Sequence, residues 1–180
     1  MHPDDVARHV DASVDVLRDA VQPDLPIVDI ELDGTQLRVR YEVELLASTP
    51  AAAGPGVLVG NQIVGTVFNV PILGSRRREQ LILTLDVTDF DSQPPTAELL
   101  AADGTPLPPE RWPRDVEGQG IVPDHPLWRR RPFFCRPGTR EFHTHPQHED
   151  EPWDAYREGM SLSNIVLSLI RDLTTRWTMQ

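Results

Sequence analysis

The densest group of side chains that can bind a metal or act as a nucleophile lies between Cys135 and His148. This stretch holds the only cysteine of the 180-residue chain and three of its six histidines. The candidate ligands in it are Cys135, Glu141, His143, His145 and His148. Zinc favours thiolate and imidazole ligands, with an occasional carboxylate, in tetrahedral geometry. The sequence therefore predicts a divalent-metal site, with Zn2+ as the expected metal.

The spacing within this stretch indicates how the ligands would converge. Residues 137–138 are Pro-Gly, which favours a turn between two short β-prone runs. The period of two in a strand would then send Glu141, His143 and His145 to the same face. A hairpin with a loop of about five residues would bring Cys135 beside Glu141. We therefore expect a metal-bearing β-hairpin.

The sequence leaves the fourth ligand open. Cys135 and two histidines fill three positions of a tetrahedral site, and either Glu141 or His148 can fill the last. His148 can alternatively orient one of the ligands through a hydrogen bond. The acidic run at residues 149–151 is expected to be solvated rather than ligating.

Three other interpretations of the cluster remain open. Cys135 can be a nucleophile, with His143 or His145 lowering its pKa or acting as its base. A set of only three ligands would leave room for a zinc-bound water, which makes a zinc hydrolase with Glu141 or Glu149 as general base. The histidines can also be a surface group beside a structural cysteine.

The elements that would position the cluster are indicated by hydrophobic periodicity. Apolar residues spaced three or four apart predict an amphipathic helix over residues 6–21. Alternating apolar residues predict strands over 28–32, 37–45, 80–87 and 96–100, with a hairpin turn at Asp33 and Gly34. A second helical pattern begins after Ser161, a suitable N-cap, and runs to about Trp177. These elements make an α+β fold with an antiparallel β-meander.

The chain is expected to form a single domain over residues 1–180, with a long irregular loop over the proline- and glycine-rich residues 103–125. A formal net charge of -11 argues against nucleic acid as a partner. No apolar run approaches the roughly 20 residues that span a bilayer, so we expect a soluble, cytoplasmic protein. The basic residues are all arginine, and no lysine occurs. The oligomeric state is not indicated.

The order of several motifs resembles the ubiquitin-conjugating enzyme (UBC) family. That family has an N-terminal helix, a strand meander, a proline-rich turn, a His-Pro-Asn motif, an acceptor cysteine, a tryptophan and a Leu- and Ile-rich helix. This chain has a proline-containing turn at 91–95, a His-Pro pair at 125–126, Cys135 ten positions after that histidine, and Trp153. The helical pattern at 162–169 follows. The resemblance covers most of the chain and implies a UBC-like fold.

Two departures from that family bear on function. The asparagine of the His-Pro-Asn motif falls on Leu127, which has no hydrogen-bond donor for an oxyanion. The interval from Cys135 to Trp153 is longer than in the family, and the extra length carries the candidate ligands. The chain is most similar to a bacterial branch of this fold, a predicted metal-binding domain family with a Cys-Glu-His-His signature. That signature would here be Cys135, Glu141, His143 and His145.

The resemblance implies a role in a prokaryotic ubiquitin-like protein-modification system, with protein partners from that system. Because a metal-bound cysteine is not a free nucleophile, we expect a non-catalytic or degenerate UBC-like module without catalytic residues. The alternative is an active conjugating enzyme in which Cys135 accepts a ubiquitin-like protein as a thioester.

Overall fold

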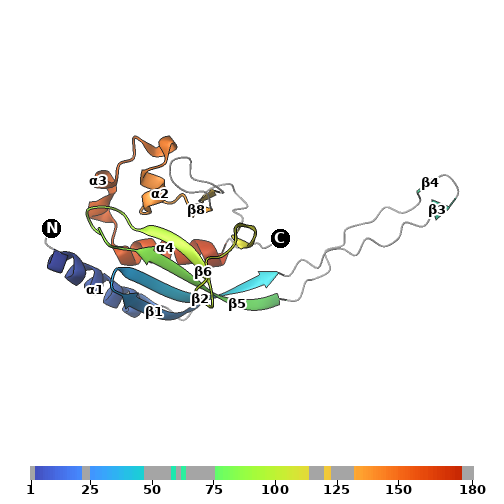
Figure 1. The fold of residues 1–180 in the computed structure, drawn as a ribbon, viewed down its shortest axis with the longest axis horizontal. Coiled ribbons are helices and arrows are strands. Elements are labelled where there is room, and N and C mark those ends of the chain that lie inside the picture. The colour runs from blue at the N-terminus through green and yellow to red at the C-terminus, as the bar shows by residue number, and fades with distance from the viewer. Residues whose placement is uncertain are drawn as a thin grey trace.

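The computed structural model describes residues 3–21, 25–46, 58–59, 62–63, 76–113, 120–122 and 132–175. An N-terminal helix leads into an antiparallel sheet, followed by a crossing segment between β6 and α4 and by a long C-terminal helix (Figure 1). The main elements are α1 (Pro3–Ala20), β1 (Ile27–Asp33), β2 (Gln36–Leu46), β5 (Arg76–Asp86), β6 (Thr96–Ala101) and α4 (Leu162–Thr175). The short ones are β3 (Leu58–Val59), β4 (Gln62–Ile63), η1 (Pro109–Arg111), β7 (Ile121–Val122), β8 (Phe133–Phe134), α2 (Arg140–His143), η2 (Pro146–His148), α3 (Trp153–Tyr156) and η3 (Arg157–Gly159).

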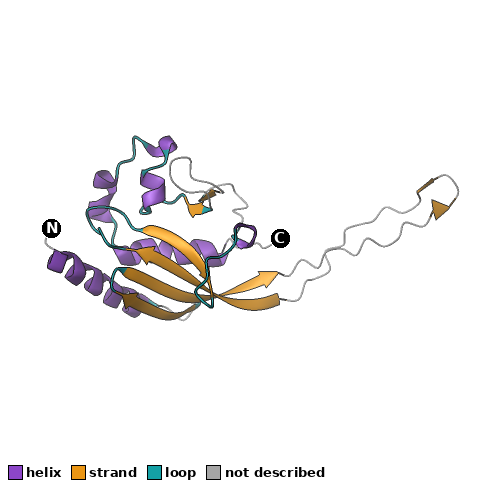
Figure 2. Cartoon of the chain, viewed as in Figure 1, coloured by secondary structure: helices purple, strands orange, loops and turns teal. Residues whose placement is uncertain are grey.

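The four main strands form one antiparallel sheet in the order β1-β2-β5-β6. Val39 of β2 lies opposite Leu83 of β5, which lies opposite Leu99 of β6, and all three are fully buried. Their face of the sheet shares one hydrophobic core with residues of α1 and α4. Figure 2 shows α4 running behind the sheet. Helices therefore cover one face of the sheet.

The periodicity of the sequence predicted the main helices and strands, although the last part of the predicted C-terminal helix, residues 176–177, lies outside the described residues. In α1 the stripe residues Val10, Val14 and Leu17 are buried, whereas Val16 on the opposite side is 56% exposed. The first hairpin turns at Gly34, whose φ of +59° suits glycine. Ser161 accepts a hydrogen bond from the backbone N–H of Asn164 at 3.2 Å, as an N-cap residue does. An α+β fold with an N-terminal helix, antiparallel sheet and C-terminal helix is confirmed.

The predicted hairpin at the ligand cluster is wrong. Strand β8 pairs with β7, and the chain does not return as a strand after the turn at Gly138 but forms the short helix α2. The reason lies in Thr139, which has an extended backbone and accepts a hydrogen bond from the N–H of Phe142 at 3.4 Å. A threonine in this position caps a helix N-terminus, and this local interaction prevails over the strand propensity.

The long irregular loop predicted over residues 103–125 is described at 103–113 and 120–122, where the regular elements are only η1 and β7; the rest of it lies outside the described residues. Its described part includes η1, followed by Trp112, whose indole N–H donates to the carbonyl of Leu107 at 2.9 Å. Trp112 is buried and its ring lies 5.3 Å from that of Phe134 in β8. Both rings belong to the hydrophobic core, so aromatic packing holds the crossing segment against it. Within the described residues no helix combines the length and apolarity that a bilayer crossing requires.

Tyr41 carries a polar group into the core. Its side chain is fully buried, and within the described part of the chain its hydroxyl has no hydrogen-bond partner. Burial raises the pKa of Tyr41 well above its usual value. We expect Tyr41→Phe to increase the free energy of unfolding by about 1 kcal/mol, because it removes the desolvation cost of the hydroxyl. Urea denaturation checks this.

Tyr156→Phe is the matched control, because the Tyr156 hydroxyl donates a hydrogen bond to Glu151. This substitution should lower the stability or leave it unchanged. A loss of stability in Tyr41→Phe as large as that in Tyr156→Phe would contradict the assignment of Tyr41 as an unsatisfied core residue.

Candidate metal centre

Cys135 lies directly after β8 and is half-buried. Its backbone N–H donates to the carbonyl of Gly120 at 2.7 Å, which continues the pairing of β7 with β8. The preceding Phe133 and Phe134 are buried. The cysteine is thus held by a strand end that is fixed in the core.

His148 is the histidine that faces the cysteine. Its Nε2 lies 3.4 Å from the Sγ of Cys135, and its Nδ1 lies 2.8 Å from Oε1 of Glu151. Because the Glu151 carboxylate can only accept, the neutral imidazole carries its proton on Nδ1 and directs the Nε2 lone pair toward the sulfur. The ring stacks on Phe142, with 3.8 Å between ring centroids. Its orientation is therefore fixed by packing and by hydrogen bonding.

Glu151 connects His148 to a further group, Tyr156. The Tyr156 hydroxyl donates to Oε2 of Glu151, while Oε1 accepts from His148. The Tyr156 hydrogen bond, followed by that from His148, lowers the pKa of Glu151. The bond to Glu151 correspondingly raises the pKa of Tyr156. From the sequence we expected Glu151 to be solvated, and its hydrogen bonds with His148 and Tyr156 were not predicted. The spacing of three residues between His148 and Glu151, one helical turn, was the signal.

His143 has both ring nitrogens engaged elsewhere. Its Nε2 accepts from the N–H of Gly138 at 3.1 Å, and its Nδ1 donates to the backbone carbonyl of Glu151 at 2.7 Å. Trp153 and Tyr156 contact the ring edge to face, at 5.4 and 5.1 Å between centroids. Burial is the main cause that lowers the pKa of His143. His143 thus joins the turn after Cys135 to the Glu151 backbone and offers no lone pair for a metal.

His145 caps the short helix η2. Its Nδ1 accepts from the N–H of Gln147 at 3.3 Å, which places the proton of the neutral ring on Nε2. The ring stacks on Phe133 and lies 5.9 Å from the ring of His148. Burial, followed by the charge of His148, lowers the pKa of His145. This histidine is a neighbour of the Cys135–His148 pair rather than part of it.

Glu141 is the completely buried acid of the cluster, with an exposed fraction of 0% on α2. Burial is the largest cause that raises the pKa of the Cys135 thiol, and the negative charges of Glu141 and Glu151 raise it further. The guanidinium of Arg136 acts in the opposite direction, although it forms an ion pair with Asp172 at 2.8 Å. The surroundings of Cys135 therefore disfavour a thiolate that has no cation beside it.

The structure brings together two of the five predicted ligands. In the described parts of the chain, no three Cys, His, Asp or Glu side chains are grouped closely enough to hold a metal ion. The donor atoms of Cys135 and His148 nevertheless fit zinc, since thiolate and imidazole are its preferred ligands. Their separation of 3.4 Å is close to the roughly 3.6 Å between sulfur and nitrogen bound to one tetrahedral zinc.

Two residues on which the family resemblance depends, His125 and Leu127, lie outside the described residues. Trp153 is described and is buried, and its indole N–H donates to the carbonyl of Asp91 at 2.9 Å. It thereby attaches α3 to the turn that follows β5. No model of a known protein family matches the chain, and no curated protein is significantly similar to it.

Proposed function

We propose that the chain is a zinc-binding UBC-like module in which Cys135 and His148 are two of the metal ligands. The observation that carries the proposal is the 3.4 Å approach of Sγ to a nitrogen whose lone pair faces it. Zinc bound by Cys135 and His148, which are 13 residues apart, would crosslink the end of β8 to η2. It would be a structural link, because metal binding and folding are coupled at such sites.

The local charge supports a metal cation at this position. A metal-binding cysteine is a thiolate, and Glu141 and Glu151 add two negative charges to its surroundings. Glu141 is fully buried, so a thiolate placed beside its carboxylate is costly unless a cation compensates the two charges. Free nucleophilic cysteines lie instead in electropositive surroundings that lower their pKa. The electrostatics therefore favour a metal ligand over a free thiolate.

The ligand set we propose differs from the one expected from the sequence. It excludes His143, whose ring nitrogens are both engaged, and begins with Cys135 and His148. Glu141 and His145 are the candidates for the remaining positions, after a change of side-chain rotamer. Glu151 is placed outside the ligand shell, where a carboxylate on the far nitrogen of a histidine fixes the ring and raises its basicity.

The biological setting of the module is part of the proposal. A helix, an antiparallel meander, a crossing segment that carries the cysteine and a closing helix follow one another along the chain. This order resembles that of the UBC family. This order supports a non-catalytic role in a prokaryotic ubiquitin-like modification system, with proteins of that system as partners. The lack of lysine suits a protein that works beside a lysine-modifying reaction.

Glu151→Gln tests the proposed site without removing a ligand. We expect zinc affinity to fall by about 10- to 100-fold, because the neutral amide no longer supports the imidazole of His148. Competition with a chromophoric chelator measures this. Glu149→Gln is the matched control, since it removes the same charge from an exposed neighbour. Equal losses of zinc affinity in both variants would mean that the overall negative charge, and not the hydrogen bond to His148, determines the affinity. This result would contradict the role of Glu151.

A second candidate function is a thioester carrier, and one observation favours it. Cys135, His148 and Glu151 form a chain of thiol, imidazole and carboxylate, the arrangement of a nucleophile, its base and the group that orients the base. The discriminating result is an adduct with a ubiquitin-like protein, formed with an activating enzyme, cleaved by added thiol and absent in Cys135→Ser. Such an adduct on metal-free protein would favour this function over zinc binding.

A further inference from the structure

The face of the sheet opposite the helices carries a group of charged side chains. Successive residues of a strand point to opposite faces of the sheet. In β2, Leu37 and the odd-numbered residues that follow it lie in the core, so Arg38 and Arg40 point outward. Asp29 and Glu31 of β1 point outward beside them. The register sets Arg40 opposite Asp29 and Arg38 opposite Glu31. Two cations and two anions thus face each other across neighbouring strands.

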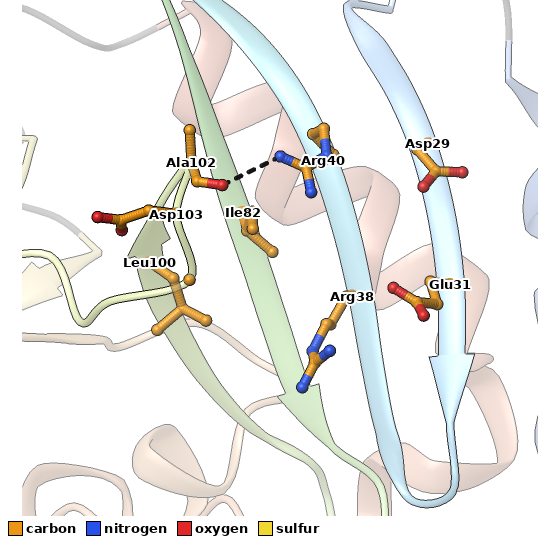
Figure 3. Close-up of a pocket in the computed structure, with 9 residues that line it drawn as sticks. Asp29, Glu31, Arg38, Arg40, Ile82, Leu100, Ala102 and Asp103 are labelled. Carbon is orange, nitrogen blue, oxygen red and sulfur yellow. Dashed lines mark hydrogen bonds between the residues drawn. The ribbon is translucent and has the colours of Figure 1, made fainter.

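These opposite charges border a cavity of about 360 Å³ (Figure 3). Ile82 of β5 and Leu100 of β6 lie opposite each other in the sheet and form its apolar part. Although no helix of the described residues covers this face, Ile82 is only 5% exposed. The cavity is lined by Asp29, Glu31, Arg38, Arg40, Ile82, Leu100, Ala102, Asp103 and Gly104.

In the described part of the structure, the β2 arginines form no ion pair with the β1 carboxylates that they face. Figure 3 shows Arg40 reaching across β5, where its guanidinium donates to the carbonyl of Ala102 at 3.3 Å. Among the described residues, no hydrogen bond or ion pair joins either arginine to Asp29 or Glu31. Cationic donors from the arginines and anionic acceptors from the carboxylates therefore both face this cavity. A ligand with a single negative charge would meet the arginines but also the three carboxylates around them.

We propose that this cavity binds a small zwitterion of the amino-acid class with an aliphatic side chain. The carboxylate of the ligand pairs with Arg38, whose planar guanidinium matches it. Its ammonium group pairs with the β1 carboxylates, and its side chain packs on Ile82 and Leu100. The volume is at the lower end of the range for small-molecule sites, which suits a ligand of this size.

The test is a ¹⁵N NMR titration of the full chain with L-leucine. We expect saturable shifts in β1, in β2 and in the turn at residues 102–104. N-acetyl-L-leucine, which lacks the ammonium group, and L-leucinamide, which lacks the carboxylate, should each bind at least tenfold more weakly. Equal binding of all three compounds, or no saturable shift with L-leucine, would overturn the proposal.

Arg38→Gln and Arg78→Gln form a matched pair of variants. Arg78 lies on the same outer face of β5 but outside the cavity, where it pairs with Glu44 at 3.6 Å. Arg38→Gln should weaken L-leucine binding at least tenfold, and Arg78→Gln should leave it unchanged. Equal effects would overturn the assignment of the cavity. If Arg38→Gln does not fold, the three compounds on the unaltered chain still decide.

Discussion

Replacing Cys135 with serine is expected to abolish stoichiometric zinc binding and to lower the melting temperature of the zinc-loaded protein. His148→Gln should act in the same way, because each substitution removes one of the two paired donors. At a free zinc concentration 1,000 times the dissociation constant, bound metal stabilises the folded state by about 4 kcal/mol. For a chain of this size that corresponds to roughly 10 °C. Elemental analysis and thermal melts with and without chelator measure both effects.

His143→Gln is the informative comparison for these two variants. It removes a ring that binds the Gly138 N–H and the Glu151 carbonyl, so the protein should become less stable with or without zinc. It should nevertheless retain one zinc per chain, because His143 offers no lone pair. Loss of zinc from His143→Gln to the extent seen in His148→Gln would restore His143 to the ligand set and refute ours.

Adding a single methyl group at Gly138 is expected to cause a large loss of stability. Its φ of +93° is rarely adopted by other residues, and an added Cβ would lie 2.8 Å from Cγ1 of Ile165 and 3.1 Å from the sulfur of Met160. Both backbone strain and overpacking therefore oppose Gly138→Ala. We expect the free energy of unfolding to fall by about 3 kcal/mol, measured by urea denaturation.

Gly104→Ala separates the two causes. Gly104 also has a positive φ, +83°, but nothing lies within 4 Å of an added Cβ. This variant should lose about 1 kcal/mol, the cost of backbone conformation alone. If both variants lost the same amount, the turn at Gly138 would not be packed against α4 in solution, and the position of Cys135 relative to that helix would need revision.

The scaffold could be predicted from the sequence because its elements are long and their burial is regular. Val10, Val14 and Leu17 repeat with the helical period, and β2 alternates over 11 residues. Each of these patterns repeats often enough to outweigh the preference of any single residue. The residues that oppose each other in the sheet then follow from the hairpin at Gly34.

The sequence showed where thiol, imidazole and carboxylate groups are concentrated, but not how they are arranged. The cluster from Cys135 to His148 is where a thiol and an imidazole meet, as their types indicated. The elements there have only two to four residues, so one hydrogen bond to Thr139 is enough to replace a strand with a helix. With a helix in place of the strand, the histidines make different contacts from those predicted. His143 and His145 bind backbone groups, and His148 faces the sulfur.

The most direct test of the account is anomalous diffraction at the zinc edge from crystals of the zinc-loaded protein. We predict one anomalous peak within bonding distance of both Cys135 Sγ and His148 Nε2, with Glu151 on the far nitrogen of that histidine and His143 outside the coordination shell. Zinc-loaded crystals that show no peak at Cys135, or a peak bound by His143 instead of His148, would contradict it.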